Sequence, residues 1–159
     1  MIMQQSRRQW LVALFALPMI VMLSTANSNA NPTVNVAKTA TCGCCQIWID
    51  YIRKEGFKVD TKNMASGQLS RFKSANGIQP EFASCHTARV GGYTIEGHVP
   101  VREIKRLLSE QPDAVGLAVP GMPLGSPGME FGADREPYDV LLIGKDGTAS
   151  VYASYGKKS

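Results

Sequence analysis

The chain has 159 residues, a formal net charge of +4, four cysteines and seven methionines. This length favours a single domain, and so small a charge without a basic cluster excludes an electrostatic footprint for nucleic acid. The composition therefore directs attention to the cysteines and to short local motifs.

Residues 1–30 have the three parts of a secretory signal peptide. Arg7 and Arg8 precede an uncharged apolar run over 10–23, and small residues follow up to position 30. The run is shorter than the ~20 residues that span a bilayer, although an N-terminal anchor is the alternative reading. Cleavage would leave one domain over 31–159 with a charge of +2 and no membrane attachment.

The rest of the chain alternates short strands with helices. Apolar residues recur at helical spacing or in short β-branched runs, and glycine or proline punctuates them. The expected elements, in chain order, are a strand over 34–37, a helix over 46–56, a strand over 57–64, a helix over 67–76, a hairpin around Gly91 and Gly92, a helix over 101–111, and strands over 138–144 and 148–155. This order predicts an α/β fold that ends in a β-hairpin.

The segment over 119–137 is rich in glycine and proline and fits neither a helix nor a central strand. A long irregular loop in a compact domain is commonly functional. It carries Met122 and Met129, and a methionine without a helix or strand face to bury is a candidate thioether ligand for Cu(I). The alternative is that each methionine fills a gap in the core.

Three cysteines lie in the motif CGCC, between the first expected strand and the first helix. Cys42 and Cys45 have the CxxC spacing of a thioredoxin-like redox motif, in which the helix N-terminus stabilises a thiolate. We expect Cys42 to be the exposed member and Cys45 to be buried. One hypothesis is therefore a thiol–disulfide oxidoreductase that uses this pair.

Cys44 is not needed by a dithiol enzyme, and a third thiolate in one turn indicates a cation among the sulfurs. Thiolates favour Cu(I), whereas a structural zinc site would show paired CxxC units or two spaced histidines. In a thioredoxin-like fold, Cys85 and His86 would enter a strand that faces the start of the first helix, so both should approach CGCC. His98 is expected to orient a ligand or to cap a helix.

Five segments together resemble one bacterial family. They are TCGCC, SCHTA, GYTIEGHVP, VPGMPLGSPGME and YDVLLIGKDG, and the resemblance spans residues 34–155. The family is that of the CopG-type periplasmic copper-resistance proteins, also catalogued as a metal-binding domain of unknown function 411. The resemblance implies a thioredoxin-like α/β domain with an inserted Gly/Pro/Met-rich loop and a C-terminal β-hairpin.

The resemblance also implies a function. It implies a periplasmic copper-binding protein with a cysteine-bridged, multinuclear Cu(I) cluster that interconverts Cu(I) and Cu(II), which leaves open whether the protein is an enzyme. Its partners would be copper ions and other periplasmic copper-handling proteins, and a copper chaperone is a further hypothesis. The implied sulfur ligands are Cys42, Cys44, Cys45 and Cys85. The implied additional ligands are His86, Met122 and Met129.

Overall fold

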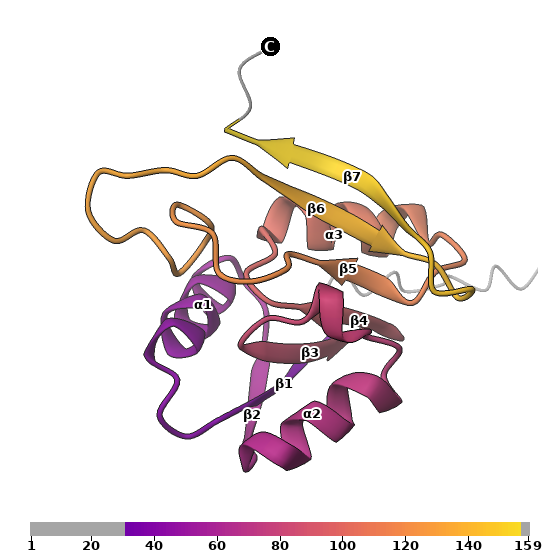
Figure 1. Cartoon of the computed structure of the whole chain (residues 1–159), viewed down its shortest axis with the longest axis horizontal. Coiled ribbons are helices and arrows are strands. Elements are labelled where there is room, and N and C mark those ends of the chain that lie inside the picture. The colour runs from indigo at the N-terminus through magenta and orange to yellow at the C-terminus, as the bar shows by residue number, and fades with distance from the viewer. Residues whose placement is uncertain (1–30, 157–159) are drawn as a thin grey trace, which may run out of the picture.

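The structure is a computed structural model that describes residues 31–156, so the expected signal peptide over 1–30 lies outside the described residues. The described chain forms a mixed α/β fold around one seven-stranded sheet, with the strand order β2-β1-β3-β4-β5-β6-β7 (Figure 1). Between residues 31 and 156, no helix is long and apolar enough to cross a bilayer.

The elements alternate along the chain as the sequence pattern predicts. The strands are β1 (Val34–Lys38), β2 (Val59–Asn63), β3 (His86–Val90), β4 (Tyr93–Glu96), β5 (Gly116–Ala118), β6 (Tyr138–Ile143) and β7 (Ala149–Tyr155). The helices are α1 (Gly43–Lys54), α2 (Ser66–Ala75) and α3 (Val101–Glu110), with one 3-10 turn, Pro80–Phe82. The 3-10 turn and β5 were not expected from the sequence.

The sheet mixes parallel and antiparallel neighbours. β1 and β2 are parallel and joined by α1, and β4 and β5 are parallel and joined by α3. The pairs β1–β3, β3–β4, β5–β6 and β6–β7 are antiparallel, which confirms the expected C-terminal hairpin. Gly91 and Gly92 form the β3–β4 turn, each with a positive φ, as a two-residue hairpin turn requires.

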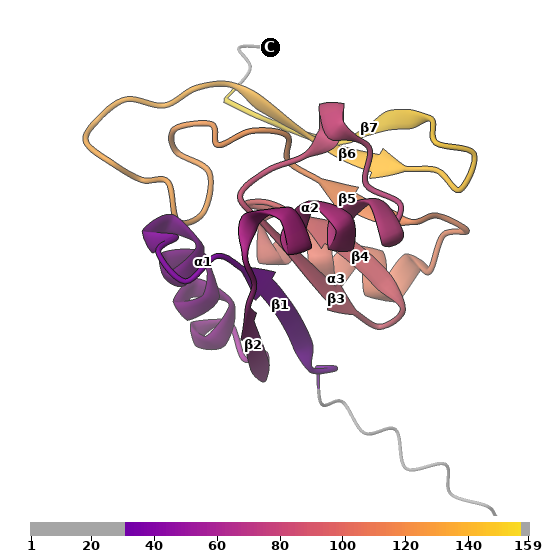
Figure 2. The same cartoon turned by 60° about the horizontal axis from the view of Figure 1, so that its bottom comes forward.

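Helices cover both faces of the sheet. Figure 2 shows α2 in front of β3 and β4, and α3 behind them. α1 lies on the same face as α3, because the Trp48 indole donates a hydrogen bond to the Val99 carbonyl and the Val101 amide donates one to the Tyr51 hydroxyl. This arrangement places the N-terminal end of α1 against the end of the β3–β4 hairpin.

α1 forms where it does because its apolar residues follow the helical period. Cys45, Trp48, Ile49 and Ile52 are all fully buried and form one face, at positions i, i+3, i+4 and i+7. The helix ends before Gly56, whose φ of 92° an L-residue would rarely adopt. The buried face anchors α1 rigidly to the sheet and so fixes the first turn of the helix, which carries Cys44 and Cys45.

The segment over 119–137 is an irregular connection between β5 and β6, as expected, and extends beyond the sheet beside α1 (Figures 1 and 2). Backbone hydrogen bonds within the loop hold it, from the Gly125 amide to the Met129 carbonyl and from the Met129 amide to the Ser126 carbonyl. A further bond joins the Gly121 amide to the Ala83 carbonyl. The loop therefore has a fixed path that lies against the segment just before Cys85.

Candidate metal centre

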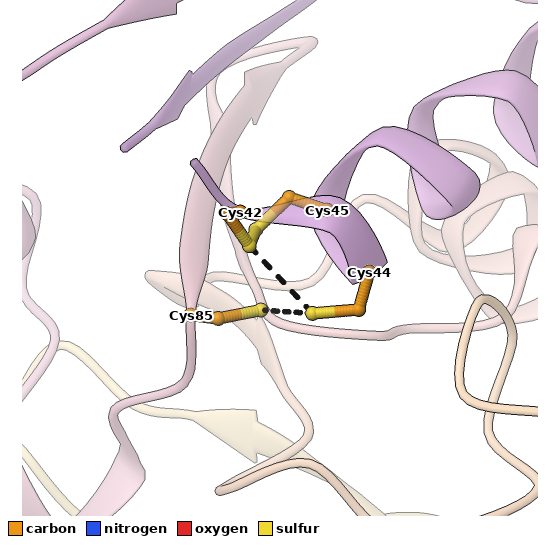
Figure 3. Close-up of side chains that lie close together, drawn as sticks. All are labelled: Cys42, Cys44, Cys45 and Cys85. Carbon is orange, nitrogen blue, oxygen red and sulfur yellow. Dashed lines mark hydrogen bonds between the residues drawn. A yellow bond between two sulfur atoms is a disulfide. The ribbon is translucent and has the colours of Figure 1, made fainter. Parts of the chain in front are cut away.

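Four sulfur atoms meet where α1 begins. Cys42 is the N-cap of α1, and Cys44 and Cys45 lie in its first turn, so the tight spacing of CGCC becomes a cluster at one helix end. Cys85 reaches this point from the segment just before β3, because β3 pairs with β1, the strand that leads into the motif. The expected convergence of all four cysteines is therefore what the structure shows (Figure 3).

Two of the four cysteines are bonded to each other. Cys42 and Cys45 form a disulfide with a Cα–Cα distance of 5.4 Å, and Cys44 and Cys85 are free thiols. The Cys44 Sγ lies 3.6 Å from the Cys42 Sγ and 3.8 Å from the Cys85 Sγ. Cys45 is buried and Cys42 is partly exposed, so Cys42 is the more exposed member of the pair, as expected.

Two imidazoles complete the cluster around Cys85. The Cys85 Sγ lies 3.3 Å from the His86 Nδ1 and 3.1 Å from the His98 Nε2. The three ligand atoms fit within 4.8 Å of one another, which is the spacing of a shared metal ion. His86 is placed where the sequence analysis expected it. His98 was expected only to orient a ligand or to cap a helix, whereas the structure puts its ring nitrogen directly at the sulfur.

The hairpin explains why Cys85 and His98 meet. In the β3–β4 register, Thr87 pairs with Glu96 and Val90 pairs with Tyr93. Continuing this register by two residues beyond Thr87 places Cys85 opposite His98. The sequence predicts a hairpin turn at Gly91 and Gly92. Counting residue pairs outward from that turn leads to the pair Cys85 and His98, so the sequence contained a signal for His98 as a candidate ligand.

The loop over 119–137 fixes the orientation of the His98 ring. The His98 Nδ1 lies 2.8 Å from the Pro127 carbonyl oxygen, which only accepts, so Nδ1 carries the proton. The Nε2 atom then presents its lone pair toward Cys85. A histidine that binds a metal ion usually donates a hydrogen bond from one ring nitrogen to a carbonyl or carboxylate oxygen, and this leaves the other ring nitrogen available to the ion.

The same loop approaches the start of α1 closely. A Cβ atom at Gly128 would lie 2.9 Å from the Trp48 backbone nitrogen and 3.1 Å from the Cys44 carbonyl oxygen. Gly128 also has a φ of 87°, so a residue without a side chain is needed there for two separate reasons. The contact brings the loop over the cysteine turn.

The two loop methionines differ in their surroundings. Met129 is 9 % exposed and is held in the loop's own turn, while Met122 is 50 % exposed. A buried Met129 agrees with a packing role, and an exposed Met122 sits on the outer surface of the loop. Coordination of copper by either thioether stays a prediction.

Burial controls the protonation of the cluster. Burial raises the pKa of the Cys85 thiol to about 12, and the neighbouring Cys44 thiol adds to the effect. Burial also lowers the pKa of His86 well below its ordinary value, and lowers the pKa of His98 against the opposing hydrogen bond to Pro127. The metal-free site is therefore a protonated Cys85 thiol beside two neutral imidazoles, whose lone pairs are available to a cation.

The second ring nitrogen of His86, which does not face Cys85, is unpaired between residues 31 and 156. His86 is fully buried, with its ring centroid 4.4 Å from that of Trp48, and its Nε2 atom has no hydrogen-bond partner among the described residues. Leaving a buried polar nitrogen unpaired costs about 1–3 kcal/mol, so such an atom needs an explanation. Sulfur and imidazole donors together suit a soft or borderline ion, and copper and zinc both fit this donor set.

A buried network of charged and polar groups supports the Cys85 segment from the face of the sheet that carries α2, which is the face opposite to α1. The Glu96 carboxylate accepts hydrogen bonds from the Lys73 ammonium at 2.5 Å, from the Thr87 hydroxyl at 2.6 Å and from the Ser84 backbone amide at 2.7 Å. Burial raises the pKa of Glu96, and these bonds oppose the shift. The network ties α2, β3 and β4 to the residue next to Cys85, and the sequence analysis did not anticipate it.

An α/β domain that gathers four cysteines and two histidines at one helix terminus defines the class: a thiol- and imidazole-rich domain suited to soft metal ions. A family model described as "Protein of unknown function, DUF411" matches residues 82–129, which include Cys85, both histidines and both loop methionines. Among proteins with curated descriptions, none matches the chain.

Solved structures match a larger part of the chain than this family model does. Two structures titled "Copper resistance protein copG", Form 1 and Form 2, are each 43% identical to the chain, with TM-scores of 0.74 and 0.73. Each alignment covers 79% of this chain and 98% of the other. The chain belongs to the family of CopG copper-resistance proteins, as the sequence resemblance predicted.

Proposed function

We propose that this protein binds several Cu(I) ions in the periplasm through bridging cysteine thiolates and takes part in copper resistance. The observation that carries the proposal is the convergence of four cysteines with His86 and His98 at the start of α1. Bridging thiolates allow few ligands to hold several ions, and sulfur favours the reduced state of copper. Membership of the copper-resistance family favours copper over zinc.

The burial of the donors supports a direction of entry into the site. Cys44 and Cys85 are partly exposed, while both histidines are fully buried. Ions would therefore enter from the thiol side and contact the imidazoles last. A thioredoxin-like arrangement, with the reactive thiols at the N-terminus of the first helix, is consistent with the β1–α1–β2 unit and forms part of this proposal.

The test is an anaerobic titration of reduced residues 31–159 with Cu(I) against a chromogenic chelator, followed by metal analysis. We expect saturation above one Cu(I) per chain and no displacement by excess zinc. Saturation at one equivalent or less would refute the multinuclear site, and displacement by zinc would refute the metal assignment. Fractionation of cells that express the full chain should recover the processed protein in the periplasm, and recovery in the cytosol would refute that location.

The Cys42–Cys45 disulfide favours a second candidate function, that of a thiol–disulfide oxidoreductase. A bonded CxxC pair at a helix N-terminus is the reactive element of such enzymes. The two functions separate at Cys44, which a dithiol enzyme does not need. The variant Cys44→Ser should bind less Cu(I) if the cysteine cluster binds copper. If it binds copper like the parent, and if the parent reduces insulin disulfides efficiently, the second function is the better one.

A further inference from the structure

Lys38 is a buried lysine at the end of β1, just before the CGCC motif. It is only 5 % exposed, although a lysine is almost never fully buried unless its charge is paired. The ammonium donates one hydrogen bond, to the carbonyl oxygen of the neighbouring Thr39 at 3.1 Å. No carboxylate within residues 31–156 forms an ion pair with it. A buried charge without a counter-charge is costly, so its presence needs an explanation.

The Lys38 side chain lies on the α1 face of the sheet, beside the candidate metal centre. Side chains alternate along a strand, so Lys38 points to the same face as Val34 and Val36. Those two valines belong to the core cluster that includes Trp48 of α1. In the β1–β3 register, Lys38 is the directly paired neighbour of His86. Burial is the main cause of the lowered pKa of His86, and the Lys38 ammonium adds to it, so the positive charge acts at this ring.

A shared carbonyl connects the Lys38 ammonium to the cysteine turn. The Thr39 carbonyl oxygen that accepts the ammonium also accepts the backbone amide of Cys42, at 3.3 Å. The ammonium and the Cys42 amide therefore meet at one oxygen atom where α1 begins. The first turn of α1 contains no acidic residue, so no carboxylate of that turn competes with the sulfurs for the ammonium.

A second buried lysine near the centre already has its counter-charge. Lys73 belongs to α2, on the other face of the sheet, and its ammonium is paired with the Glu96 carboxylate at 2.5 Å. Of the two lysines that are buried in the described part of the chain, only Lys38 lacks a carboxylate partner. Lys38 therefore supplies an uncompensated positive charge at the end of the sheet where the cysteines gather.

We propose that Lys38 is the counter-charge of the thiolate cluster, and that it favours Cu(I) over divalent ions at this centre. This rests on the proposed function and deepens it, because it names a residue that determines the choice of metal. Each cysteine that binds copper loses its proton and becomes negative, whereas each Cu(I) ion brings a single positive charge. Two thiolates that share one Cu(I) ion thus keep one net negative charge, which a buried ammonium nearby stabilises.

The same ammonium discriminates between metal ions by their charge. On an identical set of thiolates, a zinc ion leaves the complex one charge unit more positive than Cu(I) does. The attraction of that complex to Lys38 is weaker by one unit-charge interaction, which is large where little water screens it. Lys38 therefore favours the monovalent ion without being one of its ligands.

The test compares the parent with Lys38→Met, which roughly keeps the length of the side chain and removes its charge. Reduced, metal-free proteins are titrated anaerobically with Cu(I), and separately with Zn(II), each against a chromogenic chelator. We expect Lys38→Met to bind Cu(I) about tenfold more weakly and to prefer Cu(I) over zinc less strongly. The matched control is Lys62→Met: this lysine of β2 is exposed, so its loss changes the net charge equally but should leave both affinities unchanged.

Urea denaturation of the metal-free proteins separates an electrostatic role of Lys38 from a structural one. Removal of a buried charge that has no counter-charge relieves a desolvation cost. Lys38→Met should therefore unfold at the same urea concentration as the parent or at a higher one. Its Cu(I) affinity should fall without any loss of stability, whereas the loss of a merely structural lysine would lower both.

The outcomes also separate this proposal from the function on which it rests. Failure of the parent to bind Cu(I) refutes the proposed function itself. Normal Cu(I) binding by the parent, with an equal affinity in Lys38→Met, overturns only the role of Lys38. That role is also overturned if Lys62→Met shares the loss of affinity, if the preference for Cu(I) over zinc is unchanged, or if the metal-free Lys38→Met protein is less stable than the parent.

Discussion

The Glu96 carboxylate accepts a hydrogen bond from the backbone amide of Ser84, at 2.7 Å, and so connects the end of β4 to the residue beside Cys85. The same carboxylate is paired with Lys73 of α2, and both side chains are buried. One carboxylate thus accepts hydrogen bonds from a helix, from a strand and from the segment that carries Cys85.

We expect Glu96→Gln to destabilise the fold by about 3 kcal/mol, because it leaves the buried Lys73 ammonium without its counter-charge. Urea denaturation measures this directly. The matched control is Asp50→Asn, which removes an exposed ion pair with Arg53 and should leave the denaturation midpoint nearly unchanged. Equal midpoints for the two variants would contradict the importance of the buried network.

Gly128→Ala should weaken the contact between the loop and α1. The new Cβ would meet the Trp48 backbone nitrogen at 2.9 Å, so the loop must move away and the free energy of unfolding should fall by about 1–3 kcal/mol. The matched control is Gly121→Ala: this glycine also has a positive φ, but an added Cβ has no neighbour within 4 Å. Gly121→Ala should therefore cost only about 1 kcal/mol, from backbone conformation alone.

The Cu(I) affinities of these two glycine variants test whether the loop also supports the metal site. Because Pro127 precedes Gly128 and anchors the His98 ring, Gly128→Ala should lower Cu(I) affinity more than Gly121→Ala does. A Gly128→Ala protein that is destabilised yet binds Cu(I) like the parent would show that the loop does not support the site.

His98 can be tested as a ligand separately from its anchoring role. We expect His98→Ala to lower Cu(I) affinity by about tenfold or more, as loss of an imidazole or its support commonly does. In His98→Asn, the side-chain amide can still donate to the Pro127 carbonyl, but no nitrogen reaches Cys85. If Asn binds Cu(I) as poorly as Ala does, the Nε2 atom is a ligand; full recovery in Asn would assign His98 an anchoring role only.

The raised pKa of Cys85 predicts slow alkylation of the metal-free protein. Only the thiolate reacts, and with a pKa of about 12 nearly all of the Cys85 thiol is protonated at neutral pH. The rate of its reaction with iodoacetamide should therefore rise about tenfold per pH unit throughout the range from pH 7 to 10. Mass spectrometry of the Cys85 peptide measures the rate, and a plateau near pH 8 to 9, the behaviour of an ordinary thiol, would contradict the prediction.

The loop methionines are best compared one at a time, because their burial differs. Met129→Leu and Met122→Leu each keep the approximate volume and remove the sulfur, so neither should unfold the protein. If thioethers bind copper, at least one variant should show weaker Cu(I) binding or altered reduction of Cu(II). Unchanged affinity and redox behaviour in the double variant would remove both methionines from the site.

Helices and strands with a clear period were predictable from the sequence, and so was the meeting of CGCC with Cys85. The strand β5 was not, because three residues, Gly116–Ala118, are too few to show alternation. The pairing of Lys73 with Glu96 was also out of reach, since it depends on how α2 lies across the sheet. His98 was within reach, but only by extending the hairpin register past its last paired residue.

Three sulfurs lie in one turn and the fourth lies at least forty residues further along the chain, and this division has a thermodynamic consequence. A CGCC segment is a local chelator, so an unfolded chain can bind Cu(I) with those three cysteines and lacks only the donors that the β1–β3 and β3–β4 pairings bring. A ligand that binds both states stabilises the folded one only by the difference in its two affinities. If the protein binds Cu(I) as proposed, copper should thus raise its melting temperature by much less than the affinity of the folded protein for copper suggests, and the chain should be able to bind copper before it has finished folding.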